Sequence, residues 1–444
     1  MRSGVLNAVR DTVRAQLWPL PVLGVAVALV LGVVLPQVDR HADADLPSWL
    51  DSVFFSGDPG AARTVLDAIS SSLITVTSLT FSLTVVTLQL AGSQFSPRLL
   101  RTFTSDVFVQ GTLALFLATF TFSLTVLRSV RSQGAAQAVF VPRISVTASF
   151  LLAIASVIGL VVFLAHLARQ IRVETILRDV HADATATIET VLAPRSEAQV
   201  PTDPAPTPPA YASMLLAQSS GFLVGVDEDE LRACAAEHDI LCVLDARPGA
   251  SVVAGTPIGS VWSPAGPLGP DDAEQLRRRI GKGMHVSFER TAAQDVGYGL
   301  RQLADVANKA LSPGINDPTT AVHALGHVSA VLCELAGRDL GPALLRDDSG
   351  RPRVVLRRPD LADLVDLAIT QPRRYGSSDP QVMMRLFQLL EELAWHVATP
   401  DQRRVVAAQL ERLDATVSSA DFDETEVEQL QRAHARVMGA LAQA

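Results

Sequence analysis

The chain has few cysteines and few charged residues for its length. Three of its 444 residues are cysteine and 19% are charged, against about 25% charged residues in ordinary soluble domains. So few cysteines exclude a small secreted scaffold held together by disulfides. Acidic residues outnumber basic ones, 46 to 37, and the net charge of −9 argues against a broad nucleic-acid-binding surface. No nucleic-acid partner is therefore expected.

Motifs for catalysis and for cofactor binding are also missing. The sequence has no phosphate-binding loop and no G-x-S-x-G motif, and His323 and His327 lack the glutamate of a zinc-protease motif. Cys234 and His238 share the same i, i+4 spacing, but neither pair has clear further metal ligands nearby in the sequence. We therefore expect no enzyme activity, no cofactor and no bound metal.

The first 170 residues contain four long apolar runs with almost no charge. They cover 17–35, 69–92, 107–127 and 144–168. Each is close to the roughly 20 residues that a helix needs to cross a hydrocarbon core about 30 Å thick. Backbone polar groups in lipid must be satisfied within the segment, so such runs favour helices. The sequence therefore predicts a mainly α membrane protein with a four-helix transmembrane domain at 1–170 that lies in a lipid bilayer.

The arginines that flank these runs favour one orientation. Four spans place both ends of the domain on the same side, and the segments on that side carry eight arginines against five on the other. Because cytoplasmic segments are enriched in Lys and Arg, both termini are expected in the cytoplasm.

The rest of the chain changes character and predicts an α+β cytoplasmic part. Its expected pieces are a helical stalk, a linker with six prolines, a small β-module of short strands between Gly and Pro turns, and a helical cytoplasmic domain with apolar residues at i, i+3, i+4 and i+7. In order they cover 171–192, 193–218, 219–265 and 271–444.

The second apolar run is unusually polar, with ten Ser and Thr residues between 69 and 92. At 100° per residue they form two opposite sectors of the helix. Hydroxyl groups gain nothing from lipid, so each sector faces another helix or water. Two interpretations stay open: packing on both faces with hydroxyls bonded to the i−4 carbonyl, or a hydrated path along one face. One sector holds Thr77, Thr80, Thr84 and Thr87, and the other holds Ser71, Thr75, Ser78, Ser82 and Gln89; the pore-lining candidates are Thr77, Thr80, Thr84, Thr87 and Gln89.

Polar residues near the ends of the runs are candidates for the membrane interface. Ser96 lies in the QFSPR loop that interrupts the helix, and Arg98 and Arg101 are placed to contact anionic headgroups, the stalk or a substrate anion. His166 lies at the end of the fourth run, where an ionisable residue is a functional candidate.

The segment 295–321 combines turn signals with unusual polar chemistry. Pro313 and Gly314 are expected to end one helix, and Gly314 is able to take a positive φ. Asp317 is expected to cap the next helix, with Pro318 at its first position. A capped helical hairpin with surface ion pairs would explain this pattern, and a cytoplasmic functional motif is the alternative. The residues of that motif are Tyr298, Arg301, Asp305, Lys309, Asn316 and Asp317.

This segment, GYGLRQLADVANKALSPGINDPTTA, resembles the hallmark of a widespread bacterial family of predicted integral membrane proteins of unknown function. The Ser/Thr-rich second run, the QFSPR loop and the region of His166 extend the resemblance over most of the chain. The resemblance implies four N-terminal membrane helices joined to a cytoplasmic domain, and with it a bacterial inner (cell) membrane location. It implies no catalytic activity.

These features favour an oligomeric channel or transporter-like conduit for ions or small solutes, with a cytoplasmic regulatory domain. Four spans leave little room for a pore within one chain, so a homo-oligomer is expected. A membrane-anchored sensor or scaffold without transport activity is the alternative that stays open.

Overall fold

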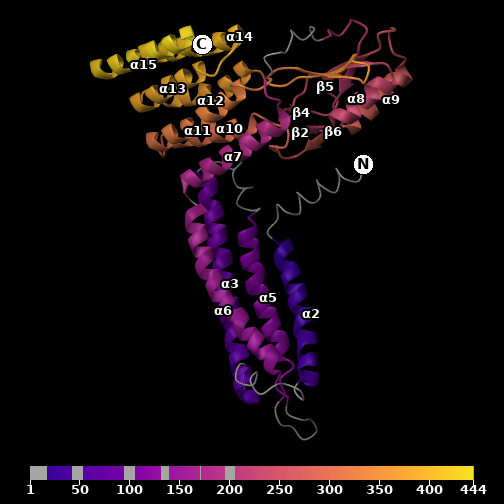
Figure 1. Ribbon diagram of the computed structural model, residues 1–444, viewed down its shortest axis with the longest axis vertical. Helices are drawn as coiled ribbons and strands as arrows, with labels where there is room; N and C mark the ends of the chain where they lie inside the picture. The colour runs from indigo at the N-terminus through magenta and orange to yellow at the C-terminus, as the bar shows by residue number, and fades with distance from the viewer. Residues whose placement is uncertain are drawn as a thin grey trace. The chain divides into compact units, whose positions relative to one another are not determined.

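The computed structural model describes residues 18–42, 54–94, 106–131, 140–170, 172–195 and 206–443. The chain divides into two compact units, Met1–Arg172 and Val173–Ala444 (Figure 1). We call them the bundle unit and the α+β unit, and each is described by itself.

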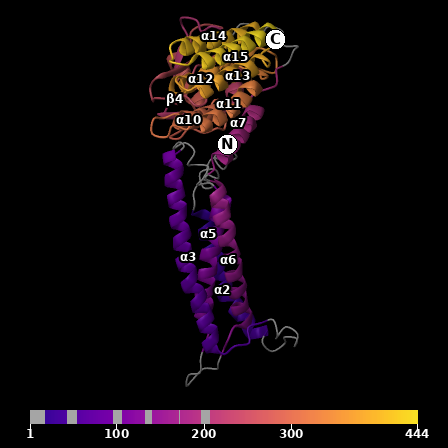
Figure 2. The ribbon, with the colours of Figure 1, turned by 90° about the vertical axis from the view of Figure 1, so that its left-hand side faces the viewer.

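The bundle unit contains four long apolar helices, which lie side by side in both views (Figures 1 and 2). They are α2 (Pro19–Ala42), α3 (Pro59–Gln94), α5 (Val107–Leu127) and α6 (Arg143–Gln170). Each is long and apolar enough to span a membrane, which confirms the four predicted spans. Helix α3 begins ten residues before the predicted run and continues through Arg63 and Asp67, because a helix, unlike a hydropathy criterion, does not stop at a charged side chain.

Helix α5 lies at the centre of the bundle. It packs against α2, α3 and α6, whereas α2 and α3 hardly touch each other within the described residues. Helix α2 presents Gly24, Ala28 and Gly32 at four-residue spacing, and a Cβ atom at Gly32 would lie 2.7 Å from the Cβ atom of Thr125 in α5. Small residues at this spacing let two helix backbones approach closely, which is a main source of helix association in lipid.

One end of the bundle is held together by polar contacts between helices. The buried Asp39 of α2 accepts hydrogen bonds from the amides of Ile144 and Ser145 at 2.9 and 3.1 Å, and from the Ser145 hydroxyl at 2.6 Å. It thereby caps the N-terminus of α6, whose first amides lack partners within the helix. Arg63 of α3 donates to the Val130 carbonyl at 3.0 Å. We call this the Asp39 end.

Helix α7 (Val173–Val191) is packed into the α+β unit. Its apolar face, with Ile176, Val180 and Ala184, is buried and contacts α10 (Tyr298–Ala310) and α11 (Pro318–Ala336). A Cβ atom at Gly299 of α10 would clash with the Cβ atom of Ala184, so the two helices approach closely. We expected a stalk at 171–192; instead, the apolar stripe of this helix finds partners within the unit.

Two small sheets form the β part of this unit. The strand order is β1-β5-β3-β8-β7 in the larger sheet and β4-β2-β6 in the smaller one. All neighbouring strands are antiparallel except β3 and β8, which are parallel. The strands are β1 (Ser213–Leu216), β2 (Gly221–Val226), β3 (Leu241–Leu244), β4 (Ser251–Val252), β5 (Pro257–Trp262), β6 (Met284–Ser287), β7 (Ala343–Arg346) and β8 (Pro352–Leu356).

The strands extend beyond the β-module that we expected at 219–265. Strand β1 lies in the predicted linker, and β6, β7 and β8 lie in the region predicted to contain only helices. Each of these strands has four or five residues, and periodicity alone does not distinguish such short apolar runs from helix.

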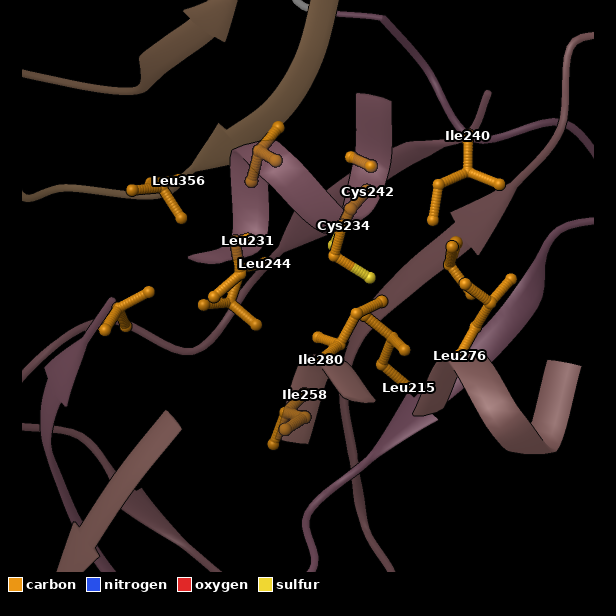
Figure 3. Close-up of a cluster of buried hydrophobic side chains, with 14 of the residues drawn as sticks. Leu215, Leu231, Cys234, Ile240, Cys242, Leu244, Ile258, Leu276, Ile280 and Leu356 are labelled. Carbon is orange, nitrogen blue, oxygen red and sulfur yellow. The ribbon is translucent and has the colours of Figure 1, made fainter. Parts of the chain in front are cut away.

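The core of the larger sheet is closed by two helices, α8 (Glu228–Glu237) and α9 (Pro270–Lys282). Leu231 and Cys234 of α8 and Leu276 of α9 belong to one buried cluster with Cys242 and Leu244 of the central strand β3 (Figure 3). Full burial raises the pKa of the Cys242 thiol to about 12. This cysteine therefore behaves as a small apolar core residue and not as a nucleophile.

The remaining helices stack in layers on α10 and α11 (Figures 1 and 2). They are α12 (Leu361–Tyr375), α13 (Pro380–Ala394), α14 (Pro400–Ser418) and α15 (Glu424–Gln443). Asp360, Asp379 and Thr399 cap α12, α13 and α14, and Thr399 forms a full capping box with Gln402. The mainly α class with an α+β second part is confirmed.

Candidate functional site

The threonine face of α3 is packed inside the bundle unit. Thr80, Thr84 and Thr87 are buried and Thr77 is half-buried, and α5 is the main neighbour of this helix. The hydroxyls of Thr77, Thr84 and Thr87 donate to carbonyls four residues earlier at 2.7, 2.8 and 2.9 Å. The buried Thr80 hydroxyl has no hydrogen-bond partner among the described residues. This face therefore has the contacts of a helix-packing surface.

The opposite face of α3 is polar and exposed over most of the helix. Its residues fall within a sector of about 80°, centred opposite the threonine face. We call this surface the α3 polar stripe; it consists of Thr64, Asp67, Ser71, Thr75, Ser78, Ser82 and Gln89, all of them exposed. Twenty-five residues separate its ends, a rise of about 38 Å, so the stripe is longer than the hydrocarbon core of about 30 Å.

The other outward surfaces of the bundle are apolar. Helix α2 exposes Val22, Leu23 and Val30, and α6 exposes Phe150 and Val157, among other large apolar side chains. Such surfaces suit contact with lipid tails. The α3 polar stripe is flanked by similar apolar residues, so it stands out as a narrow polar band on an apolar helix.

A cross-helix polar cluster lies at the opposite end of the bundle from Asp39. The Oδ2 atom of Asp106 lies 2.6 Å from Nε2 of His166 in α6 and accepts a hydrogen bond from Gln170 at 2.6 Å. Asp106 also caps α5 through the amide of Phe108, whose ring lies 4.6 Å from that of His166. The side chains of His166 and Asp106 are 23% and 11% exposed. We call this the Asp106 cluster.

His166 was a candidate from the sequence, whereas Asp106 and Gln170 were not. The signal for Asp106 was a capping residue directly before an apolar run, whereas its pairing with His166 depends on the order of the helices in space. The other interface candidates, Ser96, Arg98 and Arg101, lie outside the described residues. Gln89 belongs to the α3 polar stripe.

The segment 295–321 forms the expected helical hairpin. Asp317 caps α11 by accepting bonds from the amide and hydroxyl of Thr320 at 3.1 and 2.6 Å, and these bonds hold the pKa of Asp317 below its usual range. The residue with positive φ in the turn is Asn316, at 51°, and not Gly314. Helix α10 already ends at Ala310, and asparagine tolerates the left-handed region, so the turn does not use the conformational freedom of Gly314.

The polar residues of α10 form one face of the helix. Tyr298, Arg301, Asp305 and Lys309 lie within a sector of about 80° and are half-buried. Together they extend along about 16 Å of helix, so they form a polar face and do not converge on one reacting point. The guanidinium of Arg290 lies 5.6 Å from the centre of the Tyr298 ring.

The histidine and cysteine pairs do not assemble into a metal centre. Cys234 is buried in the sheet core, and His238 contacts its carbonyl group instead of its sulfur. His327 instead faces His181 of α7, with ring centres 5.2 Å apart. Within the described ranges no group of three or more His, Cys, Asp or Glu side chains is placed to hold a metal.

A cavity of about 300 Å³ lies within the α+β unit, between its sheets and its helices. Its wall comes from the last turn of α7, the ends of β2, β3 and β8, the start of α8 and the loop before α10. In that loop, the buried Asp295 accepts bonds from the Gly297 amide at 3.2 Å and from Arg290 at 2.5 Å. Gln294 bonds both backbone groups of Val226, at 2.7 and 3.0 Å. This cavity could not be predicted from the sequence, because its wall comes from segments up to about 170 residues apart.

Four spanning helices joined to a separate α+β unit define a multi-span membrane protein. The chain belongs to a family described as predicted membrane protein (DUF2254), whose model matches residues 14–392. This confirms the resemblance to a family of uncharacterised membrane proteins.

The curated relatives are also uncharacterised. An uncharacterised protein of Mycobacterium bovis and one of Mycobacterium tuberculosis are each 37% identical to the chain, over 99% of its length and 82% of theirs. No solved structure gives a significant match. The comparisons therefore establish a membrane protein family without a known activity.

Proposed function

We propose that the bundle unit assembles as a homo-oligomer in which the α3 polar stripe lines a path for small cations, with the α+β unit as its regulator. The observation that carries this proposal is the exposure of seven polar side chains along one face of a membrane-spanning helix. Hydroxyl, amide and carboxylate groups are costly in contact with lipid tails, so this face requires water or another protein surface.

The geometry of the hydroxyl groups favours cations over anions. The hydroxyls of Thr64, Ser71 and Thr75 donate their protons to carbonyls of the preceding turn, at 3.0, 2.8 and 3.2 Å. Their oxygen lone pairs therefore remain available to an ion and can replace part of a cation's hydration shell. The only charged member of the stripe is an acid, Asp67.

The exposed position of the stripe supports an assembly of several chains. The threonine face of α3 is buried against neighbours of the same chain, which leaves the outer face for contact with other copies. We therefore assign the path to the exposed face that includes Gln89, and helix packing to Thr77, Thr80, Thr84 and Thr87. Copies arranged around a central axis would turn their stripes toward a shared hydrated space.

Flanking arginines support an orientation with both termini in the cytoplasm of a bacterial cell, within the inner membrane. The Asp39 end and Asp67 then face outward, and the Asp106 cluster lies near the cytoplasm. An acidic residue at the outer mouth would raise the local concentration of cations there.

Ion flux into proteoliposomes that contain the purified full-length protein tests the proposal. The protein should conduct sodium or potassium above the background of empty vesicles, and Ser78→Leu should reduce this flux to near background by filling the path. Ser72→Leu is the matched control, because Ser72 is exposed on the same helix but lies outside the stripe sector.

Two outcomes would overturn the proposal. One is background flux for sodium, potassium, chloride and protons at both signs of the membrane voltage. The other is an equal loss of flux in Ser78→Leu and Ser72→Leu, which would show that the α3 polar stripe does not line the conducting path. The first outcome would favour the alternative function, a membrane-anchored sensor or scaffold.

A further inference from the structure

The cavity of the α+β unit opens where two parallel strands end together. Strands β3 and β8 run parallel, with Leu244 opposite Leu356 at their carboxyl ends, and both residues line the cavity. The amide of Arg357 donates to the Leu244 carbonyl at 3.1 Å, which holds the two ends side by side. Ligands of α/β proteins commonly bind outside the carboxyl ends of parallel strands.

Opposite charges meet in the wall of this cavity. Arg358 follows β8 and Glu228 begins α8, and Nη2 of Arg358 lies 2.7 Å from Oε1 of Glu228. The side chains are 21% and 39% exposed. The other N–H groups of Arg358 and the second carboxylate oxygen of Glu228 have no partner among the described residues, so one cation and one anion are available side by side.

The other acid of the wall is already engaged. Both carboxylate oxygens of Asp295 accept hydrogen bonds from the protein itself, one from Arg290 and one from the Gly297 amide. Arg357, which also lines the cavity, is paired with Asp245 at 3.0 Å. The Arg358–Glu228 pair is therefore the charged pair of the wall that is left to meet a ligand. The C-terminal end of α7, at Thr190–Leu192, also lines the cavity. The partial negative charge of a helix C-terminus favours an ammonium group there.

A ligand with only one charge would fit this wall poorly. An anion at Arg358 would lie beside Glu228, and a cation at Glu228 would lie beside Arg358, so each would meet a like charge in a partly desolvated site. In an α-amino acid the ammonium and carboxylate groups are attached to the same carbon. Their charges are thus as close together as those of Arg358 and Glu228 and can pair with both.

The rest of the wall suits an apolar side chain. Val226, Leu244, Val296 and Leu356 line the cavity with aliphatic groups. A volume of about 300 Å³ lies at the small end of the range for ligand pockets. We propose that this cavity binds a free α-amino acid with an apolar side chain. This inference goes beyond the proposed conduit and does not depend on it.

Calorimetric titration of the full-length protein in detergent with L-leucine tests the inference. Leucine should bind. Isocaproate, which lacks the amine, and isoamylamine, which lacks the carboxylate, should each bind about tenfold more weakly or worse, since each loses one charged hydrogen-bonding group.

Two variants assign the binding to the pair. Arg358→Gln and Glu228→Gln should each weaken leucine binding about tenfold or more. Arg412→Gln is the matched control, because Arg412 also forms an ion pair, with Asp366 at 2.7 Å, but lies outside the cavity wall. Two charge-neutralising variants on different elements keep the test interpretable if one of them fails to fold.

Three results would overturn the inference. They are the absence of leucine binding, equal binding of leucine and isocaproate, and an equal loss of affinity in Arg412→Gln. If the protein binds leucine but shows no ion flux, the proposed conduit is contradicted and the proposed amino-acid site is still supported. The two proposals can therefore be tested independently.

Discussion

Asp106, at the start of α5, contacts His166 of α6, sixty residues later in the chain. It caps α5 with one carboxylate oxygen and, with the other, contacts His166 and Gln170 of α6. At the opposite end of the bundle Asp39 similarly joins α2 to α6. Each end of the bundle thus depends on one carboxylate that serves two helices.

Replacing Asp106 should therefore cost more stability than replacing an ordinary helix cap. Asp106→Ala removes a cap and two cross-helix contacts, and we expect a loss of about 2–3 kcal/mol in the free energy of unfolding. The control is Asp58→Ala, because Asp58 caps only its own helix through the Ala61 amide at 2.7 Å, for an expected loss of about 1 kcal/mol. Equal losses in chemical unfolding in detergent would show that the cross-helix contacts contribute nothing.

The close approach of α2 and α5 predicts sensitivity to a single methyl group. Gly32→Ala would place a Cβ atom 2.7 Å from the Cβ atom of Thr125, and overpacking of this kind costs about 1–3 kcal/mol. Gly111→Ala in α5 meets no atom within 4 Å, and its gain in helix propensity should leave the thermal midpoint unchanged or higher. A thermal midpoint that falls equally in both variants would contradict the packing argument.

Gly249 lies directly against Asp295 in the wall of the cavity, so a side chain at this position should destabilise the protein. Its φ is +87°, and a Cβ atom there would clash with the Asp295 carboxylate. Gly255 has a similar φ of +81° but open space around it. Gly249→Ala should lose about 1–3 kcal/mol more than Gly255→Ala in the free energy of unfolding. Both variants place alanine at a positive φ, which strains the backbone, but only Gly249→Ala displaces Asp295. Similar losses in the two variants would leave backbone strain as the whole effect.

The contact between α7 and α11 should weaken at low pH. Burial, together with the charges of His181 and His323, holds the pKa of His327 below 6.5. The unfolded chain therefore binds the proton first, and the stabilisation from neutral His327 is complete above about pH 6.5 and is lost as the pH falls through the folded-state pKa. Thermal unfolding between pH 7.5 and 5 should show this slope, and His327→Gln should flatten it. An unchanged slope in His327→Gln would assign the pH dependence to other groups.

The sequence was sufficient to locate the spans because the requirements for a helix in lipid are local to each segment. Each apolar run of about 20 residues must satisfy its backbone within itself, so no knowledge of neighbours is needed. The same holds for the cap of Asp317, which bonds Thr320 three residues away. Contacts between residues far apart in the sequence could not be predicted in this way. Asp106 and His166, for example, come together only because α5 and α6 are antiparallel neighbours.

The α+β unit contains a second case of contacts that the sequence does not reveal. Strand β8 pairs with β3 across more than a hundred residues, and no single segment of the chain contains the cavity at the carboxyl ends of these two strands. Helical periodicity was sufficient to predict the two sectors of α3. Which sector is buried depends on the position of α5, and this position cannot be derived from periodicity.

The central position of α5 has a consequence for how the protein enters its membrane. Helices α2 and α3 emerge first during synthesis, yet among the described residues they make almost no contact with each other, and both pack on α5. The small-residue face of α2 and the threonines of α3 therefore lack the helix on which they pack until α5 is inserted. We therefore expect an interval during membrane insertion in which α2 and α3 have not yet met the helix that joins them.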